Sequence, residues 1–190
     1  MRTLASVVVT LLVSVLLLGF LGPAASGAAP PTAGRQATCQ RTLPSYPEIK
    51  RGTTSRAVRS LQCVLNDAGF GPVTVDGFYG PETQAAVKEL TDGFECCIKN
   101  PLRVRTWYWV ILFTASHKLG GLERGDSGIR VKTLQRALRA DGETLAVDGA
   151  FGGQTERALM AFQENCQEKQ TGRVDQQTLF NLSQGGCGAS

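Results

Sequence analysis

The sequence of 190 residues contains a single histidine, His117, and shows no strong excess of either charge. A catalytic zinc site needs about three ligating side chains plus a water, and one histidine with oxidised cysteines does not supply them. The net charge is only +4, so the strongly basic surface typical of nucleic-acid-binding proteins is not expected. Nucleotide-binding loops and EF-hand patterns are also missing. We therefore expect no cofactor, no metal ion and no nucleic-acid partner.

The longest apolar run lies at the N-terminus, from about Leu4 to Leu21, and Arg2 is the only charge before it. Gly22 and Pro23 break this run, and small residues follow at positions 24–29. This order is typical of a secretory signal peptide, so residues 1–28 are predicted to be removed. The alternative is a membrane anchor, but the run falls a little short of the roughly 20 residues that span a bilayer. We expect an exported protein that has no membrane contact after cleavage.

All six cysteines follow the predicted cleavage site. An even number of cysteines in an exported chain indicates disulfides, although the sequence does not choose among the pairings. We expect Cys166 to bond Cys187, because both lie in the second half of the chain. Two further bridges are expected among the remaining four, Cys39, Cys63, Cys96 and Cys97. A bond between the two adjacent cysteines would need a strained geometry and is disfavoured.

Two segments of the sequence resemble each other, because residues 49–90 align with residues 122–162 when one residue is deleted from the second copy. Internal repetition of this kind indicates two copies of one structural unit. The identical columns include Arg51/Arg124, Leu61/Leu134, Gln62/Gln135, Asp76/Asp148, Gly77/Gly149 and Thr83/Thr155.

Each copy has the pattern of three helices. In the first helix of the first copy, Val58, Leu61 and Leu65 recur at intervals of three or four, as one apolar helix face requires. Glycines at positions 69 and 142 are placed to end the first helices. The hydroxyl residues Thr54 and Ser127 are placed to cap the N-termini of these helices. The second helices are predicted to open at 80–81 and 152–153, and the third near 106 and 178.

These patterns predict an all-α fold made of two tandem three-helix mini-bundles. The first domain is expected over 39–113 and the second over 122–187, with the polar, glycine-bearing segment 114–121 as a linker. Units of this size have marginal cores, so disulfides that add about 2–4 kcal/mol each would be useful.

The motifs of both copies resemble the peptidoglycan-binding-like domain found in bacterial cell-wall hydrolases. The second copy contains V-x-x-L-Q-x-x-L at 131–138, V-D-G-x-F-G-x-x-T at 147–155 and F-Q at 162–163. The first copy has the matching motifs at 58–65 and 75–83 and a T-W pair at 106–107. The resemblance covers nearly the whole chain after residue 28. It implies a secreted or cell-wall-associated protein that binds peptidoglycan through a stem peptide or the glycan.

The first copy departs from the family pattern, since Leu90 and Thr91 replace the F-Q pair and Cys96 and Cys97 follow. If only one copy binds, the resemblance favours residues 122–182. The candidate ligand-binding residues are Arg51, Gln62, Asp76, Tyr79, Arg124, Gln135, Asp148 and Phe151. A structural role is open for each type. The aspartates suit glycine turns, the aromatic rings suit core positions, the glutamines suit bonds to a loop backbone, and the arginines suit solvated surface charges.

No catalytic residue is expected, because the two copies leave no room for a catalytic domain. A Cys–His nucleophile pair with His117 would require a thiolate, which a disulfide does not provide. The chain is predicted to be a monomer. An alternative function is an extracellular protein–protein interaction module, or an inhibitor of a cell-wall or secreted hydrolase. The run WYWVILF over 107–113 motivates it: exposed, this run would form a partner surface, whereas buried it would belong to the core of the first bundle.

Overall fold

The computed structural model describes residues 39–92, 103–104 and 106–187, and the chain from Arg35 to Ser190 forms one compact unit. The predicted signal peptide and the pair Cys96 and Cys97 lie outside the described residues.

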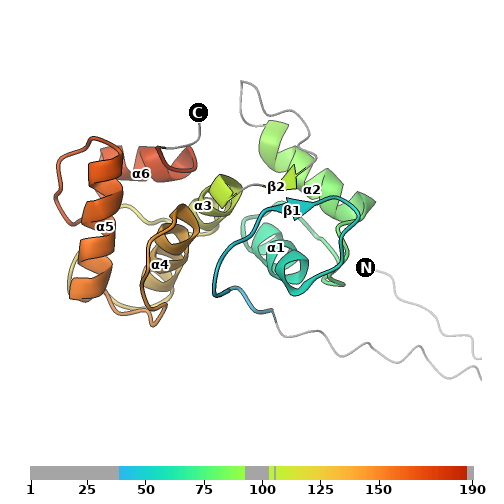
Figure 1. The fold of residues 1–190 in the computed structure, drawn as a ribbon, viewed down its shortest axis with the longest axis horizontal. Helices are drawn as coiled ribbons and strands as arrows, with labels where there is room; N and C mark the ends of the chain where they lie inside the picture. The colour runs from blue at the N-terminus through green and yellow to red at the C-terminus, as the bar shows by residue number, and fades with distance from the viewer. Residues whose placement is uncertain (1–38, 93–102, 105, 188–190) are drawn as a thin grey trace, which may run out of the picture. The chain divides into compact units, whose positions relative to one another are not determined.

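The described part of the chain is helical, with the elements in the order that the two repeats predict (Figure 1). A short antiparallel pair joins Ile49 to Val104 and Lys50 to Arg103. The all-α class of the fold is therefore confirmed. The helices are α1 (Arg56–Asp67), α2 (Pro81–Asp92), α3 (Thr106–Ser116), α4 (Ile129–Asp141), α5 (Gly153–Asn165) and α6 (Gln176–Ser183), and the strands are β1 (Ile49–Lys50) and β2 (Arg103–Val104).

The helix starts agree with the sequence for α2 and α5, but the capping residues of α1 and α4 differ from those expected. Ser55 caps α1, because its side chain accepts a hydrogen bond from the Val58 amide at 3.1 Å. Gly128 stands at the same place before α4 and offers no side-chain cap. The predicted caps are therefore wrong by one residue. The reason is that Thr54 and Ser127 form β-bridges to Phe78 and Ala150, in the loops before α2 and α5.

Helix α3 is apolar on every side, and every side chain from Tyr108 to Phe113 is at most 4% exposed. A helix that is apolar all round is stable only when other elements surround it. The elements that pack against α3 are α4 and α6 from the second repeat and α1 from the first. The run WYWVILF thus forms no partner surface. The expectation that this run belongs to the core of the first bundle alone is incomplete. Helices α4 and α6 of the second repeat supply most of the helix packing around α3.

The segment before β1 contributes to the same core. The ring of Tyr46 lies 5.2 Å from that of Trp109 and 5.1 Å from that of Phe113, and Trp109 Nε1 donates to the Pro47 carbonyl at 3.1 Å. The segment also contacts α4, where Arg136 Nε donates to Thr42 Oγ1 at 2.9 Å. One hydrophobic cluster therefore includes buried side chains from both repeats.

The interval 114–121 contains more structure than a polar linker suggests. Helix α3 continues to Ser116, and Leu119 is completely buried. The division of the chain into two domains joined by a linker stays a prediction.

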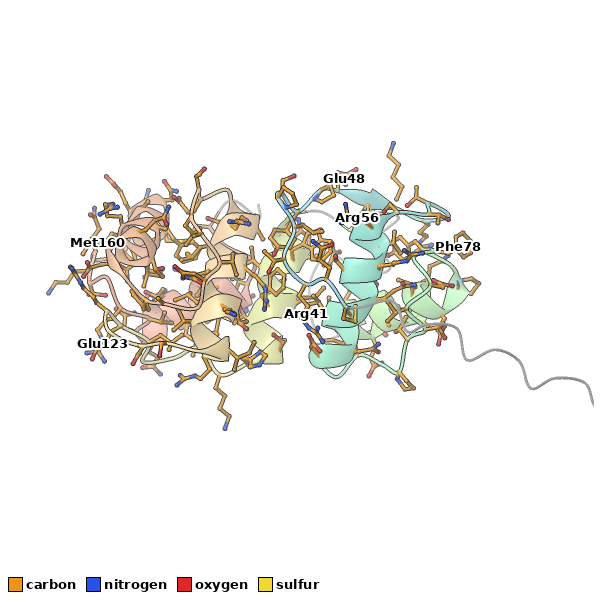
Figure 2. All side chains as sticks on the ribbon, turned by 90° about the horizontal axis from the view of Figure 1, so that it is seen from below. Arg41, Glu48, Arg56, Phe78, Glu123 and Met160 are labelled. Carbon is orange, nitrogen blue, oxygen red and sulfur yellow. A yellow bond between two sulfur atoms is a disulfide. The ribbon has the colours of Figure 1, made fainter. Side chains whose placement is uncertain are left out.

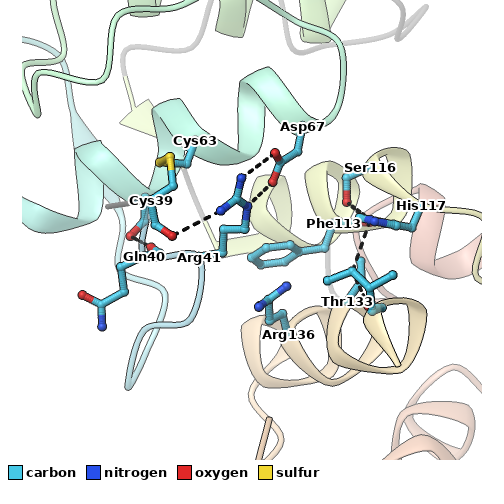
Figure 3. A network of polar contacts seen from close by, with 12 residues as sticks. Cys39, Gln40, Arg41, Cys63, Asp67, Phe113, Ser116, His117, Thr133 and Arg136 are labelled. Atoms are coloured by element: carbon cyan, nitrogen blue, oxygen red, sulfur yellow. Dashed lines mark hydrogen bonds and ion pairs between the residues drawn. A yellow bond between two sulfur atoms is a disulfide. The ribbon is translucent and has the colours of Figure 1, made fainter. Parts of the chain in front are cut away.

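Two disulfides are present among the described cysteines. The bond between Cys166 and Cys187 confirms the expected pairing. The other bond joins Cys39 to Cys63. With a bond between the two adjacent cysteines disfavoured, the sequence had implied that Cys39 and Cys63 each pair with one of them, and this implication is wrong. The segment around Cys39 lies along α1 (Figure 3), where Arg41 pairs with Asp67 and Ser60 donates to the Gln40 carbonyl. These contacts place the two sulfur atoms side by side.

Because α3 is shared by both repeats, we predict that Trp109→Ala destabilises the two repeats together. A loss of about 3–5 kcal/mol in the free energy of unfolding is expected for a tryptophan removed from a packed core. The measurement is urea denaturation followed by circular dichroism, with amide hydrogen exchange in α1 and α5. Phe78→Ala is the control, since Phe78 is 42% exposed and projects from its loop (Figure 2). Two separate transitions, with exchange protection lost in α1 alone, would contradict the shared core.

Candidate functional site

A buried glutamine organises the turn before the second helix of each repeat. In the second repeat, the Nε2 atom of Gln135 donates to Asp148 Oδ1 at 2.8 Å, to the Ala150 carbonyl at 3.1 Å and to Thr155 Oγ1 at 3.0 Å. Its Oε1 atom accepts from the Gly149 amide at 2.9 Å. One side chain from α4 thereby fixes both the turn and the start of α5.

The first repeat contains the same arrangement with nearly the same distances. Gln62 Nε2 donates to Asp76 Oδ1 at 2.7 Å and to Thr83 Oγ1 at 3.0 Å, and its Oε1 accepts from the Gly77 amide at 2.8 Å. Both glutamines are only 1% exposed. The interpretation that they bond to the neighbouring loop is therefore favoured over contact with a peptide ligand.

A third copy of this arrangement joins α5 to α6. Gln163 Nε2 donates to Thr171 Oγ1 and to Thr178 Oγ1, at 3.0 and 2.9 Å, and its Oε1 accepts from the Gly172 amide at 3.0 Å. Sequence reasoning gave Gln163 no structural role. The sequence contained a signal for this role, because Gln163 is followed by a glycine at 172 and a threonine at 178, as Gln62 and Gln135 are each followed by a glycine and a threonine. In the first repeat Thr91 takes this position, and its hydroxyl donates to the Lys88 carbonyl at 2.9 Å.

The two aspartates of the turns are held in their charged form. Asp148 Oδ1 accepts from the Ala150 amide at 2.9 Å, and this bond, together with that from Gln135, lowers the pKa of Asp148. The bond from Gln62, with that from the Phe78 amide, lowers the pKa of Asp76 in the same way. The glycine after each aspartate has a positive φ, +86° at Gly77 and +85° at Gly149. These contacts favour the turn-forming role of both aspartates.

The two aromatic candidates are buried in the core. Tyr79 is 0% exposed and Phe151 is 2% exposed, so neither ring offers a face to a ligand. Burial raises the pKa of Tyr79 to about 12, against the opposing effect of the nearby Arg51.

The two arginines lie in different environments. Arg51 is half-buried beside Tyr79. Arg124 is exposed, and its Nη1 atom donates to Glu156 Oε2 at 2.9 Å. The eight candidates therefore do not converge on one site, and their role in ligand binding stays a prediction.

Two open concave surfaces in the described part of the chain lie on either side of α6. The first, called the α6 groove, has a volume of about 930 Å³ and lies between the segment 114–120 and the α6 residues Gln176, Leu179, Phe180 and Ser183. A second hollow of about 630 Å³ adjoins it across Gln176 and Phe180 and includes Glu168 and Lys169. None of the eight predicted ligand-binding residues lines either surface. Sequence reasoning missed the groove because one of its walls was interpreted as a linker.

Metal-binding and membrane-spanning features were sought in the described part of the chain. No three histidine, cysteine, aspartate or glutamate side chains gather there in a way that could hold a metal ion. Within these same ranges, no helix has the length and apolar character needed to cross a bilayer.

A family model described as "Putative peptidoglycan binding domain" matches residues 54–90 and 127–180, which coincide with the two repeats. Both repeats belong to this peptidoglycan-binding domain family. No curated protein and no solved structure shows significant similarity to the chain. In the first repeat the match ends at Leu90, immediately before Thr91 takes the place of the glutamine. In the second repeat the match continues through Gln163 into α6.

Because Gln135 forms hydrogen bonds to both the turn and the start of α5, we predict that Gln135→Leu destabilises the second repeat. The substitution leaves the Gly149 amide and the Thr155 hydroxyl without their buried partner, which costs about 2–3 kcal/mol. Urea denaturation measures the change, and Gln170→Leu on the exposed loop is the matched control. Equal stability of the two variants would show that the buried hydrogen bonds are not needed.

The lowered pKa of Asp148 predicts how the stability of the protein depends on pH. A carboxyl group whose pKa is lower in the folded state stabilises the fold above its ordinary pKa of 3.8, and this contribution is lost as the pH falls through the lower, folded value. Asp148→Asn should therefore lower stability at pH 7 and weaken the loss of stability on acidification. Thermal unfolding between pH 7 and pH 2 tests this. An unchanged pH profile would show that the charge of Asp148 contributes nothing.

Proposed function

We propose that the protein is secreted, has no catalytic activity and binds the peptidoglycan of a bacterial cell wall. The observation that carries this proposal is the presence of two domains of the peptidoglycan-binding family in one chain. Two disulfides support an extracellular setting, because such bonds persist in oxidising compartments.

The second domain is the better candidate for binding. It keeps the glutamine arrangement at Gln163, and the family match there extends into α6, whereas the match in the first domain ends at Leu90. The corresponding helix of the first domain, α3, is covered by α4 and α6. Binding through a single domain is therefore favoured over avidity from two equivalent sites.

The absence of catalysis is proposed from the chemistry of the side chains. The single histidine has its Nδ1 atom 3.1 Å from Ser116 Oγ and 3.3 Å from Thr133 Oγ1 (Figure 3). Ser116 donates its own proton to the Phe113 carbonyl at 2.9 Å, so this pair is arranged to hold the end of α3. Such an arrangement does not activate a nucleophile, because a base would have to accept the serine proton.

The alternative, a protein–protein module or an inhibitor of a hydrolase, rested on an exposed WYWVILF run. The burial of Tyr108 to Phe113 removes that surface, and no other observation favours the alternative.

Sedimentation with insoluble peptidoglycan tests the proposed function. The oxidised protein without residues 1–28 is expected in the pellet, and an exposed control such as Phe78→Ala should sediment equally. Release of sugars or peptides into the supernatant would instead reveal an enzyme. Recovery of all the protein in the supernatant would contradict peptidoglycan binding.

A further inference from the structure

The third helices of the two domains expose the same positions very differently. The threonines of the T-W and T-L pairs align Thr106 with Thr178, which places Tyr108 of α3 opposite Phe180 of α6 in the alignment. Tyr108 is 1% exposed, whereas Phe180 is 57% exposed. Equivalent positions of the two domains thus carry an aromatic ring that is buried in the first and open in the second.

The cover on α3 comes from the second domain itself. A Cβ atom on Gly185, just after α6, would lie 3.1 Å from Trp107 Cβ and 3.3 Å from Ile111 Cδ1, so backbone packs directly on this face. The positions of α6 that match Trp107 and Ile111 are Leu179 and Ser183, and both line the α6 groove together with Phe180. Large exposed apolar side chains beside a concave surface are typical of binding sites.

We propose that the α6 groove binds a glycan–peptide fragment of peptidoglycan, with a sugar ring stacked on Phe180 and a carboxylate of the stem peptide near Lys118. This inference rests on the proposed function and assigns it a site. The C–H face of a pyranose ring is apolar, so it can pack on an open aromatic ring while the sugar hydroxyls stay hydrated.

The charge of the groove complements such a ligand. The lining residues include the cationic Lys118 and no aspartate or glutamate. Peptidoglycan stems carry carboxylates, and an exposed lysine attracts them by charge. The groove is therefore suited to an anionic peptide attached to a sugar more than to a neutral polysaccharide.

The hydroxyl groups along the groove are oriented as acceptors. Thr114 donates to the Val110 carbonyl at 2.9 Å, and Ser183 and Ser116 donate to carbonyls of Phe180 and Phe113 at 2.6 and 2.9 Å. Ser183 Oγ also accepts from Gln184 Nε2 at 3.4 Å, and Ser116 Oγ lies 3.1 Å from His117 Nδ1. A hydroxyl oxygen has two lone pairs, so each of these oxygens can still accept one hydrogen bond from a peptide N–H group or a sugar hydroxyl.

The adjoining hollow can continue the path of a longer ligand. The two carboxylates of this hollow form hydrogen bonds within the protein. Glu168 accepts from Thr178 Oγ1 at 2.7 Å, and Asp175 accepts from the Thr178 amide at 3.0 Å. Lys169 on the same side is exposed, so a second cation lies beyond Phe180.

The test uses isothermal titration of the oxidised chain without residues 1–28. The probes are a disaccharide–peptide fragment of peptidoglycan, the peptide-free disaccharide and the free stem peptide. Phe180→Ala and Lys118→Gln are the test variants. Phe78→Ala and Lys50→Gln are matched controls, because they remove an exposed ring and an exposed lysine from the first domain. Thermal unfolding verifies that each variant is folded.

We expect the disaccharide–peptide fragment to bind most tightly to the unchanged chain. Phe180→Ala should weaken its binding about tenfold, as for a central aromatic contact, and Lys118→Gln should weaken it several-fold and reduce its dependence on salt. The controls should bind like the unchanged chain.

The possible results distinguish a failure of the proposed site from a failure of the proposed function. If the unchanged chain binds but both test variants bind equally well, the α6 groove is not the site, while the proposed function stands. If the free stem peptide binds as tightly as the full fragment, stacking of a sugar on Phe180 is overturned. If neither the fragment nor insoluble peptidoglycan binds the unchanged chain, the proposed function fails and the inference fails with it.

Discussion

Helix α3 places the side chains from Tyr108 to Phe113 in a core to which both repeats contribute. A helix without a polar face gains stability only when other elements surround it, and here elements of both repeats pack against it. The segment 39–47, fixed to α1 by the disulfide at Cys39, covers one side through Tyr46, and α1, α4 and α6 pack against the others. Two units with marginal cores are thereby combined into one larger core.

The glutamine arrangement is the local counterpart of this shared core. A side-chain amide has two N–H donors and one carbonyl oxygen. At Gln135 the two donors are shared among an aspartate, a carbonyl and a threonine, while the oxygen accepts from a glycine amide. The same geometry occurs at Gln62, Gln135 and Gln163, each time between one helix and the turn before the next. Such fully satisfied polar groups specify one loop conformation, because any alternative would leave buried donors without partners. The residues most characteristic of the family are thus engaged in holding its loops.

This use of the motif residues has a consequence for function. A side chain whose hydrogen bonds are all formed within the fold is not available to a ligand. The side chains on the outer face of the third helix do not hold the turns in this way. In the first domain that face meets the second domain, and in the second it lines the α6 groove. Duplication of one unit therefore produced one helix that holds the domains together and one whose equivalent surface is open.

The sequence by itself determined the repeat, the helices and the pairing of Cys166 with Cys187, because these depend on periodicity, glycine turns and proximity along the chain. It also indicated that the glutamines and the aspartates belong to the turns. The position of α3 between the repeats, the bond from Cys39 to Cys63 and the exposure of Phe180 were decided only by the tertiary structure. Each of these depends on which surfaces meet across long stretches of chain. An apolar sequence pattern indicates that a helix is buried, but it does not indicate which other elements bury it.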